Sequence, residues 1–347
     1  MLKRDIIVVG ASAGGIGPLQ QFLGGIAPGF GGTVFVVLHI APYSRSHLAE
    51  ILGKSTSLTV AEARDEAPLE PGTVYVAVSD HHLLLESGRM LVKRGPKENR
   101  FRPSIDALFR SAAYTYGPRV VGVILSGVLN DGTSGLWTVK RLGGLAIIQD
   151  PDEAEHPEMP LNARDHVAID HCLRADEIGR LLAELPAVAS TAGALVPALS
   201  AEEERLLHTE VLIAARNDAF DIGILSHGVY TPFTCPECQG ALLRLQEGSI
   251  LRFRCHTGHA FTASALLAAV TGSVEEKLWQ AIRGLEETTL LLEGIARQFT
   301  GLGNTQAAAL FAARAEATAV QARSLQEAIG RQAPISEDLR FGEESSL

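Results

Sequence analysis

The chain has 347 residues, 46% hydrophobic and 20% charged, as in a globular protein long enough for two or more domains. Its formal net charge of −10 and the absence of any apolar run of about 18 residues argue against nucleic-acid binding and direct membrane insertion. The first apolar run, Ile6–Val9, is too short for a signal peptide, so we expect a cytoplasmic protein.

Residues 1–185 alternate short apolar runs with amphipathic segments. The expected strands are Asp5–Val9, Thr33–His39, Thr73–Ala77, Val120–Ser126 and Leu145–Gln149. The expected helices are Gly17–Gly25, Arg45–Leu52, Pro103–Thr115 and Gly132–Leu142. Several strand runs are apolar at every position, which is typical of strands buried on both faces of a parallel sheet. The alternation predicts an α/β fold with a doubly wound, mostly parallel sheet, that is, a three-layer αβα sandwich.

The remaining residues divide into four segments by composition. A linker rich in small residues is expected over residues 186–231, and a small cysteine-containing module follows at 232–270. Apolar residues at helical spacing on both sides of a glycine-containing turn predict an α-helical hairpin over residues 271–330. The last segment, 331–347, is acidic and is expected to be a flexible tail.

Ser12 lies in the glycine-rich segment GASAGG, directly after the first expected strand. A dinucleotide-binding loop would have a glycine in place of Ser12 and a carboxylate at the end of the second strand, where His39 stands. Both differences count against a nucleotide-dependent oxidoreductase. A serine in such a turn is placed like a nucleophile, and His39 ends the expected neighbouring strand, about 4.8 Å away.

Asp131 follows the third long apolar run, so it is expected at the same edge of the sheet as Ser12 and His39. A serine hydroxyl needs a base to take its proton, and the base needs a third group to orient it. These three residues therefore predict a Ser–His–Asp triad. Each has a structural alternative: Ser12 and Asp131 as helix N-caps, and His39 as a core histidine.

Five segments occur in a recognisable order over residues 4–185: GASAGG, HIAPYSRSHLAEIL, NRFRPSIDALF, GVILSGVLNDGTSGL and MPLNA. Together they resemble the catalytic domain of the bacterial chemotaxis protein-glutamate methylesterases. The resemblance implies a hydrolase that cleaves glutamate methyl esters on chemoreceptors, releases methanol, needs no catalytic cofactor and also deamidates receptor glutamine. It places the catalytic serine, histidine and aspartate of the family on Ser12, His39 and Asp131.

The resemblance further implies an oxyanion hole made of backbone N–H groups near Ala13 and Val128. The family usually has Met-Gly where this chain has Val128 and Leu129, so a leucine replaces a glycine beside the second donor.

The expected partner is a methylated chemoreceptor or a receptor-like signalling protein. Chemotaxis members of the family carry a receiver domain ahead of the catalytic domain, whereas the first catalytic strand is expected here at residue 5. We therefore expect a regulatory protein in trans, or the C-terminal region, to take the regulatory role. The alternative function is a catalytically weak binding module that recognises methylated or acidic receptor segments.

Cys235, Cys238, Cys255 and His259 form two ligand-spaced pairs with 16 residues between them. This set and spacing predict a zinc-ribbon-like module with a structural zinc ion. Because all four ligands come from protein, the metal is expected to be closed and non-catalytic. His256 is a poorer choice, since neighbouring residues of a strand point to opposite sides. The alternative is a redox dithiol, which lacks its usual βαβ context here.

Overall fold

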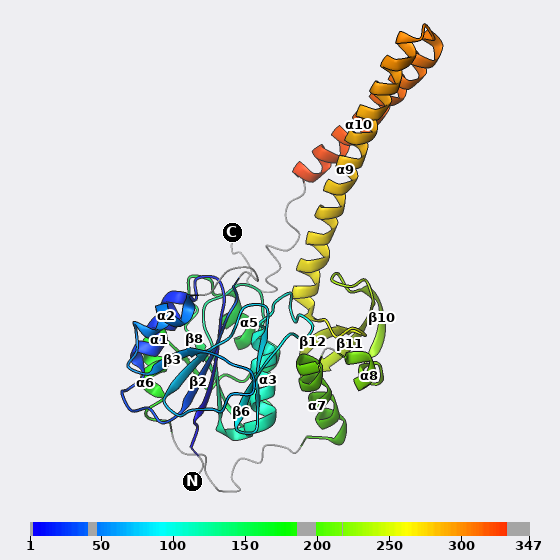
Figure 1. The fold of residues 1–347 in the computed structure, drawn as a ribbon. Helices are drawn as coiled ribbons and strands as arrows, with labels where there is room; N and C mark the ends of the chain where they lie inside the picture. The colour runs from blue at the N-terminus through cyan, green and yellow to red at the C-terminus, as the bar shows by residue number, and fades with distance from the viewer. Residues whose placement is uncertain (1–2, 41–46, 186–198, 217, 332–347) are drawn as a thin grey trace, which may run out of the picture. The chain divides into compact units, whose positions relative to one another are not determined.

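A seven-stranded parallel sheet forms the centre of the first part of the chain (Figure 1). The computed structural model describes residues 3–40, 47–185, 199–216 and 218–331. The strand order is β3-β4-β2-β1-β7-β8-β9, with every neighbouring pair parallel. The strands are β1 (Ile6–Ala11), β2 (Thr33–Leu38), β3 (Thr59–Glu62), β4 (Thr73–Val76), β7 (Val120–Ile124), β8 (Leu145–Gln149) and β9 (His171–Leu173). The predicted doubly wound sheet is confirmed, and β3 and β9 extend its edges.

Helices cover both faces of this sheet. One face carries α1 (Ile16–Gly25), α2 (Leu48–Gly53) and α6 (Ala175–Leu181). The other carries α3 (Ile105–Tyr116), α4 (Thr133–Arg141) and α5 (Glu158–His166). Along β1, Ile7 and Val9 face the first layer and Ile6 and Val8 the second. Because both faces are buried, the central strands are apolar at nearly every position.

A short antiparallel hairpin, β5 (His82–Glu86) and β6 (Arg89–Lys93), packs beside α3. Its residues Leu83, Leu85 and Met90 join the core on that side. The sequence analysis did not predict this hairpin.

A second, four-stranded antiparallel sheet follows after two helices. Helices α7 (Ala201–Arg216) and α8 (Ala219–Ile222) precede β10 (Val229–Thr234), β11 (Ala241–Glu247), β12 (Ile250–Cys255) and β13 (Ala260–Thr262). The predicted linker over 186–231 is wrong in its later part, since α7 buries Leu207, Ile213 and Ala214. Residues 186–198 lie outside the described residues. The described residues up to Leu266 form one compact unit, which includes this sheet.

The second unit begins at Leu267 and contains most of a helical hairpin. Its helices are α9 (Ala263–Gly301), which starts in the first unit, and α10 (Thr305–Arg331). The rings of Phe299 and Phe311 stack at 5.5 Å across the pair. The predicted hairpin is confirmed, with an earlier start than residue 271, while the expected tail lies outside the described residues from 332 onward. Within the described part of the chain, no helix has the length and apolar character needed to cross a bilayer.

Candidate active site

Ser12 lies in the turn between β1 and α1. Its backbone N–H donates to Ser126 O at 2.9 Å, and its carbonyl accepts from the N–H of Gly15 at 3.0 Å. Gly14 has φ +66°, a conformation that disfavours other side chains. At Gly127, in the loop after β7, a Cβ atom would lie 2.8 Å from Ser12 Cβ, so only glycine lets this loop approach so closely. The turn therefore presents Ser12 between the ends of β2 and β7, where the strand order reverses.

His39 follows β2 at the position next to Ser12. The register of β1 and β2 pairs Ala11 with Leu38, so the two following residues leave the sheet side by side. The His39 Nδ1 atom lies 3.0 Å from Ser12 Oγ. The Phe101 ring stacks on the imidazole at 3.6 Å and 5°, and the His39 side chain is only 4% exposed. The imidazole is thereby held in one orientation.

Asp131 completes the arrangement predicted from the sequence. The His39 Nε2 atom lies 2.8 Å from Asp131 Oδ2. With Nε2–H donating to this carboxylate, Nδ1 is free to accept the hydroxyl proton of Ser12. In the serine-protease triad Nε2 faces the serine and Nδ1 faces the aspartate, whereas here Nδ1 faces Ser12 and Nε2 faces Asp131. The histidine still links the serine to the aspartate.

The Asp131 carboxylate is buried among hydrogen-bond donors. It accepts from Asn99 Nδ2 at 2.8 Å, from Ser104 Oγ at 2.9 Å and from the Ile105 N–H at 2.7 Å. Burial by itself raises the pKa of Asp131, but hydrogen bonding and charge from His39, together with the Asn99 and Ile105 donors, hold it below its usual value. Asp131 is therefore charged at neutral pH and orients the imidazole.

A second buried carboxylate, Asp106, lies close to Asp131. Asn99 Nδ2 donates to Asp106 Oδ2 at 2.8 Å, and the N–H groups of Gly132 and Gly135 donate to Oδ1. Burial and the charge of Asp131 raise the pKa of Asp106 to about 8, although Arg110 opposes this shift. The two carboxylates therefore titrate far apart, and Asp131 carries the charge.

The backbone N–H groups of Ala13 and Val128 make no hydrogen bond to another backbone group among the described residues. Ala13 follows Ser12 directly, and Val128 follows the close contact between β7 and Ser12, so both groups suit the expected oxyanion hole. Leu129 has φ +62°, a left-handed conformation that glycine adopts freely and leucine does not. The Asn162 amide donates to the Leu129 carbonyl at 2.9 Å and holds this turn.

The sequence analysis missed three contributors to the site: Asn99, Phe101 and Ser104. All three lie in the segment NRFRPSIDALF, which served there only as a mark of family resemblance. Ser104 follows Pro103 and directly precedes α3, and this position was a signal, since a serine there commonly interacts near a helix N-terminus. No local pattern connects Asn99 to Asp131, which is 32 positions away, or Phe101 to His39, which is farther still.

Three cysteines and a histidine gather at one end of the four-stranded sheet. One ligand atom each from Cys235, Cys238, Cys255 and His259 lies within 4.8 Å of the others. The Cys238 and Cys255 sulfurs are 3.6 Å apart, and His259 Nδ1 lies 3.7 Å from Cys235 Sγ. Two tetrahedral zinc–sulfur bonds of ~2.3 Å would separate their sulfurs by about 3.8 Å, so donor type and spacing fit zinc. His259, and not His256, is the imidazole beside the sulfurs.

Comparison with known proteins gives matches to the parallel-sheet region. Residues 7–182 match the family model described as CheB methylesterase. A putative protein-glutamate methylesterase/protein-glutamine glutaminase of Leptospira interrogans (strain Fiocruz L1-130) is 37% identical over 185 residues, covering 53% of this chain and 96% of that protein. A protein-glutamate methylesterase/protein-glutamine glutaminase 2 of Anaeromyxobacter dehalogenans is 40% identical over 183 residues, covering 53% of this chain and 54% of that protein.

A solved structure shares the fold of the same region. The crystal structure of the Thermotoga maritima CheB methylesterase catalytic domain aligns with a TM-score of 0.50 and 33% identity, covering 52% of this chain and 97% of that chain. The family match ends before α7, so it does not include the four-stranded sheet or the helical hairpin.

Proposed function

The chain belongs to the CheB methylesterase family, and we propose that it hydrolyses glutamate methyl esters on chemoreceptor-type proteins and releases methanol. The observation that supports this most is the continuous contact from Ser12 through His39 to Asp131. A binding module would not need these three side chains to be connected, so the geometry favours the enzyme over the alternative function.

The reaction follows from the placement of these groups. The His39 Nδ1 atom takes the hydroxyl proton while Ser12 Oγ attacks the ester carbonyl, and the charged Asp131 stabilises the imidazolium that forms. The N–H groups of Ala13 and Val128 donate to the developing oxyanion. His39 then returns the proton to the departing methoxide, which leaves as methanol. Water, deprotonated by His39, attacks the acyl-enzyme. His39 then returns this proton to Ser12 Oγ as that oxygen leaves, which frees the glutamate carboxylate and restores the enzyme.

The same steps apply to a receptor glutamine, with ammonia as the leaving group in place of methanol. The relatives named above carry both activities in their names, and we extend both to this chain as part of the proposal. The cytoplasmic location and a regulatory protein in trans stay predictions.

The decisive test compares methanol release from a methylated receptor fragment by the wild type and by Ser12→Ala. We expect a loss of about 10³-fold or more, since members of a triad act as a unit. Equal release by the two proteins would exclude Ser12 as the nucleophile. No release by a folded wild-type protein would contradict the proposed substrate.

We also propose a structural zinc ion held by Cys235, Cys238, Cys255 and His259. The support is the donor set and its spacing, and the ion would contribute to folding because its ligands must converge. Elemental analysis of the purified full chain should find about one zinc per chain, and Cys238→Ser should lower both the zinc content and the melting temperature. The matched control is Cys172→Ser, because Cys172 is exposed and lies outside the cluster. Unchanged zinc content in Cys238→Ser would contradict the site.

A further inference from the structure

Residues 97–101 join the candidate active site to the four-stranded sheet. The Asn99 N–H donates to Ala260 O at 2.8 Å, and the Ala260 N–H donates to Lys97 O at 3.2 Å. The Thr262 N–H donates to the side-chain oxygen of Asn99 at 2.8 Å. The segment therefore pairs with the edge strand β13 of a sheet that the family match does not include.

The same segment contacts two of the three triad residues. Asn99 Nδ2 donates to Asp131 Oδ1 at 2.8 Å, and the Phe101 ring stacks on His39. The Asn99 side chain thus bonds to β13 with its Oδ1 atom and to the Asp131 carboxylate with its Nδ2 atom. Both Asn99 and Asp131 are buried, so no water competes freely for these bonds.

The backbone of this segment needs support from outside itself. Asn99 has φ +50° and Arg100 has φ +75°, two consecutive residues in the left-handed region. This conformation is unfavourable for residues other than glycine, although asparagine is among those that tolerate it better. The hydrogen bonds to Ala260 and Thr262 offset this cost and keep Asn99 and Phe101 where they meet the triad.

A second contact runs from β13 to the residue before Asp131. The Thr262 hydroxyl donates to Asn130 Oδ1 at 2.6 Å, and both side chains are buried. The strand β13 therefore contacts the site from two directions, at Asn99 and at Asn130.

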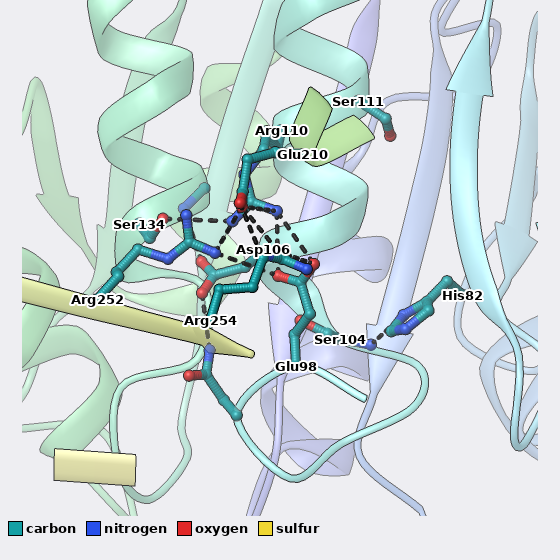
Figure 2. A network of polar contacts seen from close by, with 12 residues as sticks. His82, Glu98, Ser104, Asp106, Arg110, Ser111, Ser134, Glu210, Arg252 and Arg254 are labelled. Atoms are coloured by element: carbon teal, nitrogen blue, oxygen red, sulfur yellow. Dashed lines mark hydrogen bonds and ion pairs between the residues drawn. The ribbon is translucent and has the colours of Figure 1, made fainter. Parts of the chain in front are cut away.

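A buried ionic cluster holds the segment and the sheet together (Figure 2). Glu98 accepts from Arg110 Nη1 at 3.0 Å and from Arg254 Nη2 at 2.7 Å. Arg254 also pairs with Glu210 of α7, and its Nη1 donates to Gly258 O at 2.6 Å. Since Gly258 lies between Cys255 and His259, one guanidinium connects the proposed metal-ligand loop to the residue preceding Asn99.

We propose that Asn99 is a positioning residue for the His39–Asp131 pair and that β13 holds it in place, so that the four-stranded sheet is a working part of the active site. The proposal rests on the proposed hydrolase function. It assigns to residues 255–262 a role in the reaction without any contact to substrate.

The test uses the full chain with three single variants. Asn99→Gly removes the amide while accepting the positive φ. Thr262→Val removes the hydroxyl bond from β13 to Asn130 and keeps the backbone bond to Asn99, and Thr138→Val is the matched control. Thr138 is a buried threonine whose hydroxyl donates to Ser134 O within α4, so the chemical change is the same. All variants carry Trp279→Phe, so that Trp137, which lies against Gly248 in the β11–β12 turn, reports whether the sheet stays in contact.

Two rates are measured across pH: methanol release from a methylated receptor fragment, and labelling of Ser12 by a fluorophosphonate, which requires the triad but no receptor recognition. With Trp137 emission unchanged, we expect Asn99→Gly to lower kcat and the labelling rate about 10- to 100-fold with KM within about twofold. The acid limb of the pH–rate profile should move to lower pH, because a displaced Asp131 stabilises the imidazolium less. Thr262→Val should lower the same rates about threefold to tenfold, and Thr138→Val should leave them unchanged.

Each other outcome counts against the proposal. Wild-type rates in Asn99→Gly, or a loss confined to KM with the acid limb in place, would overturn the positioning role. A loss in Asn99→Gly with none in Thr262→Val would overturn the contribution that β13 makes through Asn130. Labelling without methanol release in the wild type would contradict the proposed substrate, and the labelling rates would still decide the positioning role. No labelling of the wild type would overturn the triad and this inference together.

Discussion

The central strands of the parallel sheet and β12 of the four-stranded sheet are buried by different means. Strands β1, β2 and β7 are covered on both faces by aliphatic and aromatic side chains. The second sheet meets the rest of its unit through charged side chains that are nearly inaccessible to water: Glu98, Arg110, Glu210, Glu247, Arg252 and Arg254. Apolar burial is nondirectional, whereas a buried ion pair requires its partners in a defined geometry. The first sheet thus provides a stable scaffold. The ion pairs of the second sheet fix how that sheet is oriented against the scaffold.

This difference matters because the active site draws on both regions. Ser12, His39 and Asp131 come from strand ends of the apolar sheet, while Asn99 and Phe101 come from the segment bound to β13. The comparison predicts that changes in the first region act on chemistry or on global stability. Changes in the four-stranded sheet should act on the position of the His39–Asp131 pair.

The largest expected effect is on chemistry alone. Asp131→Asn should lower turnover about 10³- to 10⁴-fold, because a neutral amide neither fixes the tautomer of His39 nor stabilises its charged form. The measurement is kcat for methanol release, with circular dichroism to show an intact fold. Asp170→Asn is the control: Asp170 is an aspartate of the same sheet region, bonded to Lys140 and the Ala146 N–H, and its loss should leave kcat unchanged. A comparable loss in both variants would make the effect structural.

Next in size is the loss of one charge from the ionic cluster. Glu98→Gln leaves Arg110 and Arg254 without a full countercharge and should lower the free energy of unfolding by about 3–5 kcal/mol. Ile147→Val in the apolar sheet removes one buried methyl group and should cost about 1 kcal/mol. Urea denaturation of both variants measures the contrast. An equal loss of unfolding free energy in the two variants would mean that the ionic cluster tolerates substitution as well as the apolar core does.

Acid should weaken the second region first. Burial raises the pKa of Glu210, but the guanidinium groups of Arg252, Arg254 and Arg110 outweigh it and lower the pKa to about 2. This folded-state value lies below that of the unfolded chain, so the stabilisation is complete above about pH 5 and is lost as the pH falls toward 2. Urea unfolding of the chain carrying Trp279→Phe, followed by Trp137 emission, should show this decline, and Glu210→Gln should flatten it. An unchanged slope in that variant would assign the acid sensitivity to other carboxyl groups.

The smallest expected effect is at the turn beside the proposed oxyanion hole. Leu129→Gly relieves a left-handed leucine but adds backbone entropy to the unfolded chain, so the free energy of unfolding should change by less than about 1 kcal/mol. Methanol release should stay within about threefold of the wild type. A large gain in kcat would show that Leu129 misplaces the Val128 N–H.

The local pattern of the sequence was sufficient to predict the parallel sheet and to place Ser12, His39 and Asp131 at its edge. Continuous apolar runs can be buried only between two layers, and strands that follow one another in parallel bring their carboxyl ends to one edge. That is why Ser12, His39 and Asp131 were found without any knowledge of contacts. The spacing of the cysteines predicted that Cys235, Cys238, Cys255 and His259 come together, since residues on two short turns need only a short hairpin to converge.

Only the tertiary structure revealed that α7 and the four-stranded sheet belong to the catalytic unit. Glu98, Glu210 and Arg254 are widely separated along the chain, and as isolated charged residues they are most simply read as solvated. Their burial depends on all of them meeting at once, which no local period encodes. The same reason hid Asn99, whose amide has two carboxylates and a strand edge as partners only after the chain has folded.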